Sequence, residues 1–166
     1  ILNGDEPVGD RPGVLELDYG RLDTKEVIIG DTDFGRLENR FATHVSTGPI
    51  TLGKAAGAFG RYQLSFGSLT TPGTTVGDQG SGYFNHFGDH TVNGTLAIGA
   101  DGAYDALSGR VNASTIDNAG RYIAGGDHVI DGNAFDNSGT LDYQGSTMVG
   151  TEVYFYASLN APLHNT

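Results

Sequence analysis

The chain has 166 residues and a formal net charge of −11, with 9 Lys and Arg against 20 Asp and Glu. Because the basic residues are scattered and form no stripe, the sequence argues against a nucleic-acid partner and against an anionic membrane surface. The lack of cysteine excludes disulfides and thiolate metal sites, and no apolar run approaches the roughly 20 residues needed for membrane insertion.

The chain starts without the charged and apolar segments of a secretory signal and without an initiating Met. Few Lys and Met residues combined with abundant Gly, Thr, Ser, Asn and Asp are typical of bacterial secreted proteins. We therefore expect a mature protein located outside the cell or at the cell surface. Its length fits one domain, and no linker divides it.

Residues 1–12 are polar and acidic and contain Pro7 and Pro12, so we expect an extended N-terminal arm. Such an arm can contact a second copy of the chain. Its candidate contact residues are Ile1 and Leu2.

Residues 13–147 contain an internal repeat. Gly30-Asp31 recurs 47 residues later as Gly77-Asp78, and Gly67 recurs 42 residues later as Gly109. In the last copy, Gly88-Asp89-His90 recurs 38 residues later as Gly126-Asp127-His128. The chain therefore holds about three long units, of which the last is shortened.

A unit of about 45 residues fits a two-helix repeat, a propeller blade or two coils of a β-solenoid. Apolar residues alternate, as in Leu15-x-Leu17-x-Tyr19, and 27 glycines would destabilise helices. Turn dipeptides such as Asn93-Gly94 leave the propeller open as an alternative, although three blades are fewer than a propeller needs. The sequence favours an all-β, single-stranded parallel β-solenoid (β-helix) of about six coils, with roughly 22 to 23 residues per coil.

Residues 148–166 break the repeat and are predicted to form a C-terminal strand and tail. The predicted strand Glu152–Leu159 is aromatic on both faces and needs cover on both sides. It either caps its own last coil or links to another subunit. The candidate assembly residues here are Glu152, Val153, Tyr154, Phe155, Tyr156 and Leu159.

A family resemblance is carried by three segments: GRYQLSFGSL (60–69), GSGYFNH (80–86) and TVNGTLAIG (91–99). They resemble the secreted bacterial β-solenoid repeats of autotransporter passengers and of surface proteins with PEP-CTERM sorting tags. The resemblance covers most of residues 13–145. It implies a bacterial surface solenoid that serves as a stalk, an adhesin or a matrix protein.

Three histidines, His44, His90 and His128, fall at or within one residue of the same repeat position, so we predict a ladder of imidazoles on one outer face. Copies two coils apart are separated by roughly 9 to 10 Å, too far to share a metal ion at the ~2 Å bonds that His makes. His86 takes the position of Asn39 in the preceding unit. This pair is predicted to form a hydrogen-bonded polar ladder inside the coil.

Asp31 and Asp78, with Asn118 in the third unit, recur after the same corner, where short polar side chains cap turns. The alternative is calcium binding, with Asp31, Asp33 and Asp78 as candidate ligands, although the tandem nonapeptide of calcium β-rolls is missing. No other metal or cofactor is expected.

The sequence has no Gly-x-Ser-x-Gly elbow, His-Glu-x-x-His motif or phosphate loop, and its carboxylates are scattered among corners. We therefore expect a non-enzymatic protein, and a polysaccharide-active β-helix enzyme is the least favoured alternative.

Solenoid ends expose strand edges that recruit other strands, and contacts between unlike ends build open filaments. The first hypothesis is therefore a structural subunit that assembles with itself, end to end, into an extracellular filament or surface matrix. The second is an adhesin that binds surface glycans through Tyr19, Tyr62, Tyr83 and Tyr104 on one solenoid face.

Overall fold

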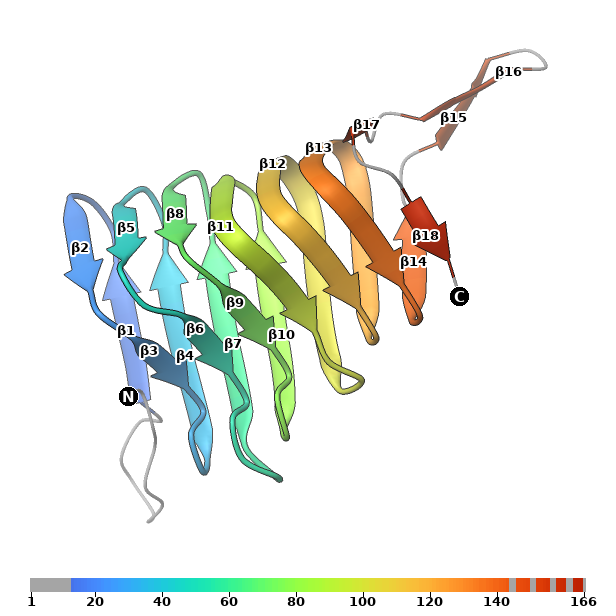
Figure 1. Cartoon of the computed structure of the whole chain (residues 1–166). Helices are drawn as coiled ribbons and strands as arrows, with labels where there is room; N and C mark the ends of the chain where they lie inside the picture. Colours follow the sequence, from blue (N-terminus) through green and yellow to red (C-terminus); the bar gives the residue numbers. More distant parts are fainter. Residues whose placement is uncertain (1–12, 144–145, 150–151, 156–157, 161–162, 166) are drawn as a thin grey trace.

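The computed structural model describes residues 13–143, 146–149, 152–155, 158–160 and 163–165 (Figure 1). The regular segments of this part are all β-strands, stacked as a parallel solenoid of about six coils, which confirms the predicted fold class. Within these residues no helix is long and apolar enough to cross a membrane. The predicted N-terminal arm, with Ile1 and Leu2, lies outside the described residues.

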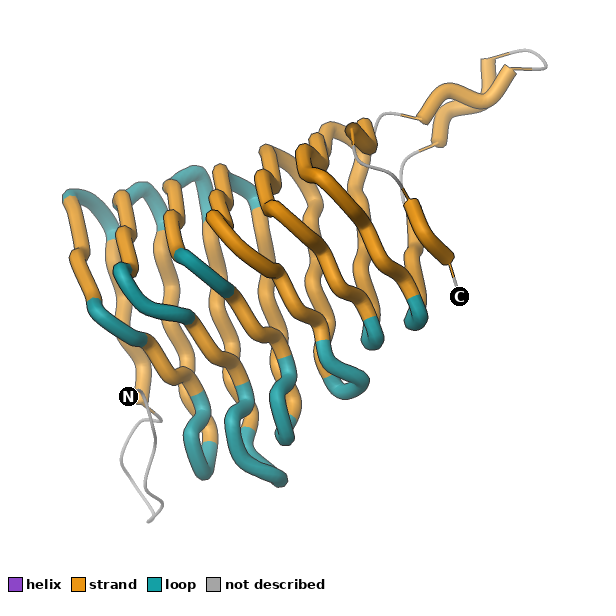
Figure 2. Tube along the Cα trace, in the orientation of Figure 1, coloured by secondary structure: helices purple, strands orange, loops and turns teal. Residues whose placement is uncertain are grey.

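Each of the first three coils consists of three short strands, whereas in later coils strands merge into long bent ones (Figure 2). The first three coils hold β1 (Gly13–Leu17), β2 (Arg21–Thr24), β3 (Val27–Ile29), β4 (Phe34–Asn39), β5 (Thr43–Ser46), β6 (Ile50–Leu52), β7 (Phe59–Leu64), β8 (Ser68–Thr71) and β9 (Thr74–Val76). The next three hold β10 (Ser81–His86), β11 (Asp89–Ile98), β12 (Gly102–Asn118) and β13 (Arg121–Asn137). The last strands are β14 (Thr140–Tyr143), β15 (Ser146–Val149), β16 (Glu152–Phe155), β17 (Ser158–Asn160) and β18 (Leu163–Asn165).

Parallel pairing between successive coils produces three faces. Face A comprises β1, β4, β7, β10, the first parts of β12 and β13, and β14. Face B comprises β2, β5, β8, the first part of β11, the middle of β12 and β13, and β17. Face C comprises β3, β6, β9, the last parts of β11, β12 and β13, and β18.

The coils differ in length. Paired residues on face A are 22, 25, 22, 20, 18 and 19 positions apart from the first coil to the last. A 22-residue coil next to a 25-residue coil accounts for the 47-residue repeat, and the shorter later coils account for the spacing of 42. The 38-residue match is two positions out of register, because Asp89 aligns through Arg110 with Val129. Each long unit of the sequence is therefore two coils, as predicted.

Aromatic rings stack along the inner side of face A. Tyr62, Phe84, Tyr104 and Tyr122 occupy one register position in four successive coils, and each is fully buried. Successive ring centroids are 4.8, 4.9 and 5.2 Å apart, close to the spacing of neighbouring strands. Each ring pair contributes roughly 0.5–1.5 kcal/mol beyond the burial of its area. This stack forms the centre of the core.

In every coil a glycine lies within one residue of the start of the face A strand. A Cβ at Gly60 would lie 2.0 Å from the carbonyl oxygen of Ile29, and one at Gly102 would lie 2.0 Å from that of Val76. The chain needs glycine here because the backbone turning from face C into face A passes this close to the previous coil. The column consists of Gly13, Gly35, Gly60, Gly82 and Gly102, and of Gly120 and Gly139 just before the paired residues Arg121 and Thr140.

The C-terminal segment differs from the single strand predicted over Glu152–Leu159. β16 pairs antiparallel with β15, whereas β17 pairs in parallel with β13 on face B. β14 and β18 also pair with β13, on faces A and C. The solenoid therefore continues as a seventh, interrupted coil, and the β15–β16 hairpin is an insertion within it.

Replacing Gly102 by Ala should lower the free energy of unfolding by about 2–3 kcal/mol or more, because the added methyl group collides with backbone that cannot move without separating two coils. Gly73 is a matched control, because a Cβ there meets only the carbonyl oxygen of Thr95, at 3.8 Å. Gly73→Ala should stay within about 0.5 kcal/mol of the unmodified chain. Urea denaturation followed by circular dichroism measures both, and equal losses would contradict the close-approach explanation.

Candidate binding surface

Three of the four large apolar side chains that the described residues expose form one row. Tyr19, Phe41 and Phe66 are 79%, 52% and 70% exposed. Their successive ring centroids are 5.4 and 5.7 Å apart, with the ring planes within 13° of parallel. We call this row the aromatic ladder. Contiguous exposed apolar surface of this kind marks sites of interaction.

The ladder lies at the corner between faces A and B in the first three coils. Three residues separate the strands there, and the ladder residue is the middle one in each case. Backbone hydrogen bonds from Arg40 N to Leu17 O and from Ser65 N to Asn39 O hold the three corners in register. In the fourth coil only two residues separate β10 from β11, so the row ends at the third coil.

Phe66 is held in an unfavourable backbone conformation. Its φ of 59° is the only positive value among the described residues other than glycine. This region costs an L-residue roughly 1–2 kcal/mol, and bulky side chains rarely occupy it. Asn or Gly would suit this backbone better. Stacking on Phe41 offsets this cost in part or in whole, and the strained and exposed Phe66 makes the row a candidate binding surface.

The stacking determines what the ladder can bind. Phe41 has a neighbouring ring against each of its faces, so the ladder offers ring edges along its length and open faces only at Tyr19 and Phe66. A sugar ring needs an open aromatic face, whereas ring edges accept aromatic and thioether side chains. The arrangement is therefore suited to apolar protein side chains.

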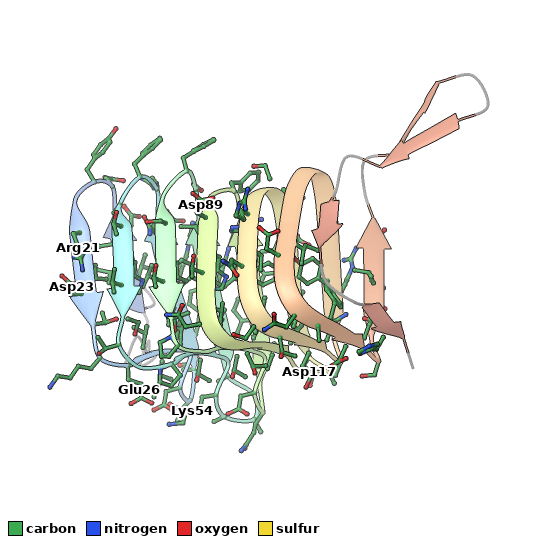
Figure 3. All side chains as sticks on the ribbon, turned by 45° about the horizontal axis from the view of Figure 1, so that its top comes forward. Arg21, Asp23, Glu26, Lys54, Asp89 and Asp117 are labelled. Carbon is green, nitrogen blue, oxygen red and sulfur yellow. The ribbon has the colours of Figure 1, made fainter. Side chains whose placement is uncertain are left out.

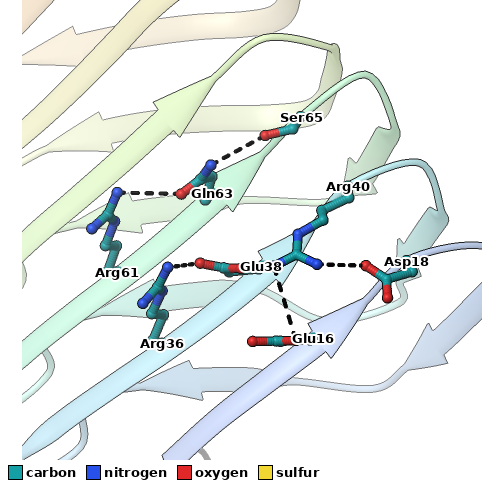
Figure 4. A network of polar contacts seen from close by, with 8 residues as sticks. All are labelled: Glu16, Asp18, Arg36, Glu38, Arg40, Arg61, Gln63 and Ser65. Atoms are coloured by element: carbon teal, nitrogen blue, oxygen red, sulfur yellow. Dashed lines mark hydrogen bonds and ion pairs between the residues drawn. The ribbon is translucent and has the colours of Figure 1, made fainter.

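Ion pairs border the ladder on face A (Figure 4). Arg40 donates hydrogen bonds of 2.9 Å to both Asp18 and Glu38, and Arg36 contacts the other oxygen of Glu38. The side chain of Glu38 is only 5% exposed, so these two guanidinium groups compensate a carboxylate that is nearly buried. The network links Arg40, which precedes Phe41, to Asp18 of the preceding coil and to Glu38 of its own coil.

A second ion pair borders the ladder on face B, at β2 (Figure 3). Arg21 Nε donates to both carboxylate oxygens of Asp23, at 3.0 and 2.9 Å, and this hydrogen bonding lowers the pKa of Asp23. The ladder is therefore an apolar strip between two charged borders. An apolar centre with a polar rim is the usual anatomy of a protein interface.

The tyrosine face proposed for glycan binding is not formed. Tyr62 and Tyr104 are fully buried in the core stack, and only Tyr19 is strongly exposed. Tyr83 is half-buried, and its hydroxyl donates to Asp105. Burial raises the pKa of Tyr83, and the hydrogen bond to Asp105 adds to this effect. The predicted set is split between the two sides of the strands because Tyr62 and Tyr83 lie one position out of register.

The histidine ladder predicted for the surface is also wrong. His44 and His90 share an inward register position with Leu69 and Val111, and both are fully buried. His128 pairs with Gly109, two positions before this row, and its side chain lies outside the described part. The imidazoles are inside because the adjacent coils supply hydroxyl partners for them.

Both buried histidines have the same surroundings. His44 lies 2.9 Å from the Tyr62 hydroxyl through Nδ1 and 3.0 Å from Thr24 Oγ1 through Nε2. His90 repeats this arrangement with the Tyr104 hydroxyl at 2.8 Å and with Thr74 Oγ1 at 3.1 Å. Burial lowers the pKa of His44 to about 4 and that of His90 to about 3. Both rings are therefore neutral at pH 7.

Asn39 and His86 lie inside the coil as predicted, and both are fully buried. They do not form a ladder with each other, because Leu64 lies between them in the register. Asn39 instead accepts a hydrogen bond from Ala42 N and donates one to Ser68 O, so it braces the corner beneath the ladder.

The aspartates proposed as calcium ligands lie near the corner between faces C and A. Asp33 accepts a hydrogen bond from the amide of Phe34, which is turn capping. Lys54 is 3.8 Å from Asp31 and belongs to the coil between Asp31 and Asp78. In the described residues no three acidic or histidine side chains are grouped as a metal would require.

Asn118 does not share this corner position. It pairs with Ile98 on the inner side of face C and is fully buried. Its amide donates to the side chain of Asn137 at 2.6 Å and to Thr140 O at 3.0 Å. The prediction that Asn118 caps the same turn as Asp31 and Asp78 is therefore wrong, because Asn118 aligns through Ile98 with Val76, two positions before Asp78.

The candidate assembly residues of the C-terminal segment lie in two strands. Glu152, Val153, Tyr154 and Phe155 form β16 of the hairpin, and Leu159 of the seventh coil pairs with Ile130 of the sixth. Tyr156 lies outside the described residues.

Phe41 and Phe66 are the ladder residues that the sequence analysis did not name as surface candidates. The signal was available, because Tyr19, Phe41 and Phe66 are spaced by 22 and 25 residues, the lengths of the first two coils. Comparison at the two-coil distance of 47 residues matches Tyr19 with Phe66 and passes over the coil between them.

A comparison of the chain with protein-family models, curated proteins and solved structures found no match.

Substituting Asn at Phe66 should cost less stability than the same substitution at Phe41. Phe66→Asn loses one stacked neighbour, worth roughly 0.5–1.5 kcal/mol, but relieves about 1 kcal/mol of backbone strain. Phe41→Asn loses two stacked neighbours and relieves nothing, so its free energy of unfolding should fall by about 1–2 kcal/mol. Urea denaturation of the two variants tests this order, and a larger loss at Phe66 would refute the assigned strain.

The buried histidines should make the fold sensitive to acid. Their pKa values are lower in the folded chain than the unfolded value of about 6.5. Their contribution to folding stability is therefore complete above pH 6.5, and it is lost as the pH falls toward 4 for His44 and toward 3 for His90. Below pH 6.5 each histidine should lower the free energy of unfolding by about 1.4 kcal/mol for every pH unit of acidification. His90→Leu, which copies Leu69 in the same row, should therefore reduce the slope of unfolding free energy against pH by about this amount. Urea denaturation at a series of pH values measures the slope, and an unchanged slope would show that His90 ionises freely in the fold.

Proposed function

We propose that the chain is a non-enzymatic, extracellular structural protein whose copies stack end to end into a filament or surface matrix. The observation that carries this proposal is the edge of the first coil. Within the described residues β1, β2 and β3 each pair with one strand only, on the side of the second coil. Their other edges hold backbone donors and acceptors that a further coil can pair with.

The opposite end has the matching arrangement. β14, β17 and β18 lie on the sixth coil, one on each face, in the same order as β1, β2 and β3. A second copy placed on this end continues all three parallel ladders with the polarity that they have inside the chain. Because the two ends are unlike, such a contact repeats without closing and gives a filament.

The composition supports the same proposal. The absence of cysteine and the abundance of Gly, Thr, Ser, Asn and Asp suit a secreted protein, and a net charge of −11 opposes uncontrolled edge pairing. Like charges on neighbouring copies repel, so salt should favour assembly by screening them. Seven strand spacings per copy give an axial repeat of about 34 Å.

The proposal predicts fibres of the purified chain, with this axial repeat in negative-stain images and more polymer at molar than at physiological salt. The sharpest variant is at β2. The amides of Thr43 and Thr47 donate to Gly20 O and Thr24 O, so alternation directs the backbone N–H of Asp23 to the open edge. Asp23→Pro removes this donor and leaves the backbone hydrogen bonds between the first two coils in place.

Asp23→Pro should raise the concentration needed for assembly by about tenfold or more, because roughly 1.4 kcal/mol per contact is lost. Asp23→Ala loses the same ion pair with Arg21 and should assemble like the unmodified chain. Sedimentation velocity measures assembly, and circular dichroism confirms that each variant is folded. A chain that stays monomeric at every concentration and salt tested would refute the proposed function.

A further inference from the structure

The hairpin β15–β16 and the aromatic ladder occupy the same corner of the solenoid. β14 belongs to face A and β17 to face B, so the hairpin is inserted where the last coil turns from face A to face B. The ladder is at this corner in the first three coils. Figure 1 shows the hairpin leaving this edge and extending past the last coil, away from the first one.

The hairpin cannot reach the ladder of its own chain. From the corner of the third coil to that of the seventh there are four strand spacings, about 19 Å. Each hairpin strand has four residues, which span about 13 Å, and the hairpin extends in the opposite direction. Coils four to six therefore separate the two elements within one copy.

The ladder of the next copy in an end-to-end stack is within reach. Its first coil would follow the seventh coil of the preceding copy at one strand spacing, about 5 Å, and its ladder would extend about 10 Å further. A hairpin about 13 Å long, starting from the same corner, passes the first two ladder positions, at about 5 and 10 Å, and ends about 2 Å short of the third. The lengths and the placement of the two elements correspond.

The chemistry of the two elements also corresponds. The ladder presents ring edges between charged borders. Phe66 has an exposed ring and a strained backbone with positive φ. Five of the eight hairpin strand residues are apolar or aromatic, and one is charged, in a chain whose net charge is −11. In the hairpin register Met148 pairs with Val153, and Thr147 pairs with Tyr154. Thioether and aromatic side chains are favourable partners for ring edges.

We propose that the β15–β16 hairpin of one copy docks on the aromatic ladder of the next copy, so that Tyr19, Phe41 and Phe66 are the receiving surface of a clasp across the junction. This inference rests on the proposed end-to-end assembly. It assigns to the ladder a partner of defined sequence, a second copy of this chain, and explains why the ladder occupies only the first coils.

Cysteine cross-linking tests the contact directly, because the natural chain has no cysteine. Phe41→Cys protein is mixed with Tyr154→Cys protein under assembly conditions and treated with a short bis-maleimide. A covalent dimer containing one chain of each variant is expected. Pro72→Cys is the control partner, because Pro72 is exposed at the corner between faces B and C of the third coil. Equal cross-linking of Tyr154→Cys to both partners would overturn the proposal.

The second test removes the ladder without touching the strand edges. A variant carrying Tyr19→Ser, Phe41→Ser and Phe66→Ser should remain folded by circular dichroism, although it loses the stacking between the exposed rings. It should need at least about tenfold more protein for assembly, because these rings would be buried at the junction. The control carries Lys25→Ser, Thr47→Ser and Pro72→Ser, at exposed positions of the next corner, and should assemble normally.

The outcomes separate the two proposals. If the unmodified chain forms fibres and the ladder variant forms them equally well, the clasp is wrong and the end-to-end assembly stands. If the unmodified chain forms no assembly at all, the proposed function fails and the clasp fails with it. If one chain carrying both Phe66→Cys and Tyr154→Cys links within itself as a monomer, the hairpin contacts its own ladder and the clasp is overturned.

Discussion

Hydrogen bonding between successive coils places equivalent residues one strand spacing apart, and the rest of the structure depends on this spacing. Inside, it brings the rings of Tyr62 and Phe84 to 4.8 Å. Outside, it brings the rings of Tyr19 and Phe41 to 5.4 Å. The same constraint therefore builds the centre of the core and the exposed ladder, and a residue's neighbours are set by its register position more than by its sequence neighbours. Repeat proteins of this kind are held together by nearest-neighbour contacts.

The spacing also explains how polar side chains come to be buried. An imidazole in the core of a small domain needs partners for both of its nitrogens. His44 obtains one hydroxyl from Tyr62 of the following coil and another from Thr24 of the preceding one. His90 uses Tyr104 in the same way. Because each coil supplies the partner that its neighbour lacks, the row of aliphatic residues tolerates two histidines.

The sequence was sufficient to predict the strand period, the two-coil unit and the number of coils, because these leave regular marks in the chain. Glycine at the start of each face A strand is such a mark, although its main cause is the close approach of the previous coil rather than a positive φ. The surface was harder to predict. Corners of different length change which residues face outward, so His44 and Tyr62 were predicted on the outer surface of the solenoid although they lie inside it. Phe41 was missed because its ring neighbours come from the coils before and after it.

The C-terminal segment shows a different limit of sequence reasoning. Aromatic residues from Glu152 to Leu159 suggest one continuous strand, and alternation alone cannot reveal that β16 pairs with β15 while β17 returns to the solenoid. Strand partners are a long-range property, and a segment with two possible partners has no local signal that selects between them. The division therefore becomes visible only in three dimensions.

The unequal coil lengths have a further consequence. The corner between faces C and A contains six residues at 53–58, four at 77–80 and two at 119–120, yet the strands on either side keep their register. Chain length at this corner is therefore uncoupled from the core, and exposed Ala56 and Gly57 lie at the tip of its longest loop. A peptide or small domain grafted between them would be displayed as a side branch while the stacked coils continue undisturbed beneath it.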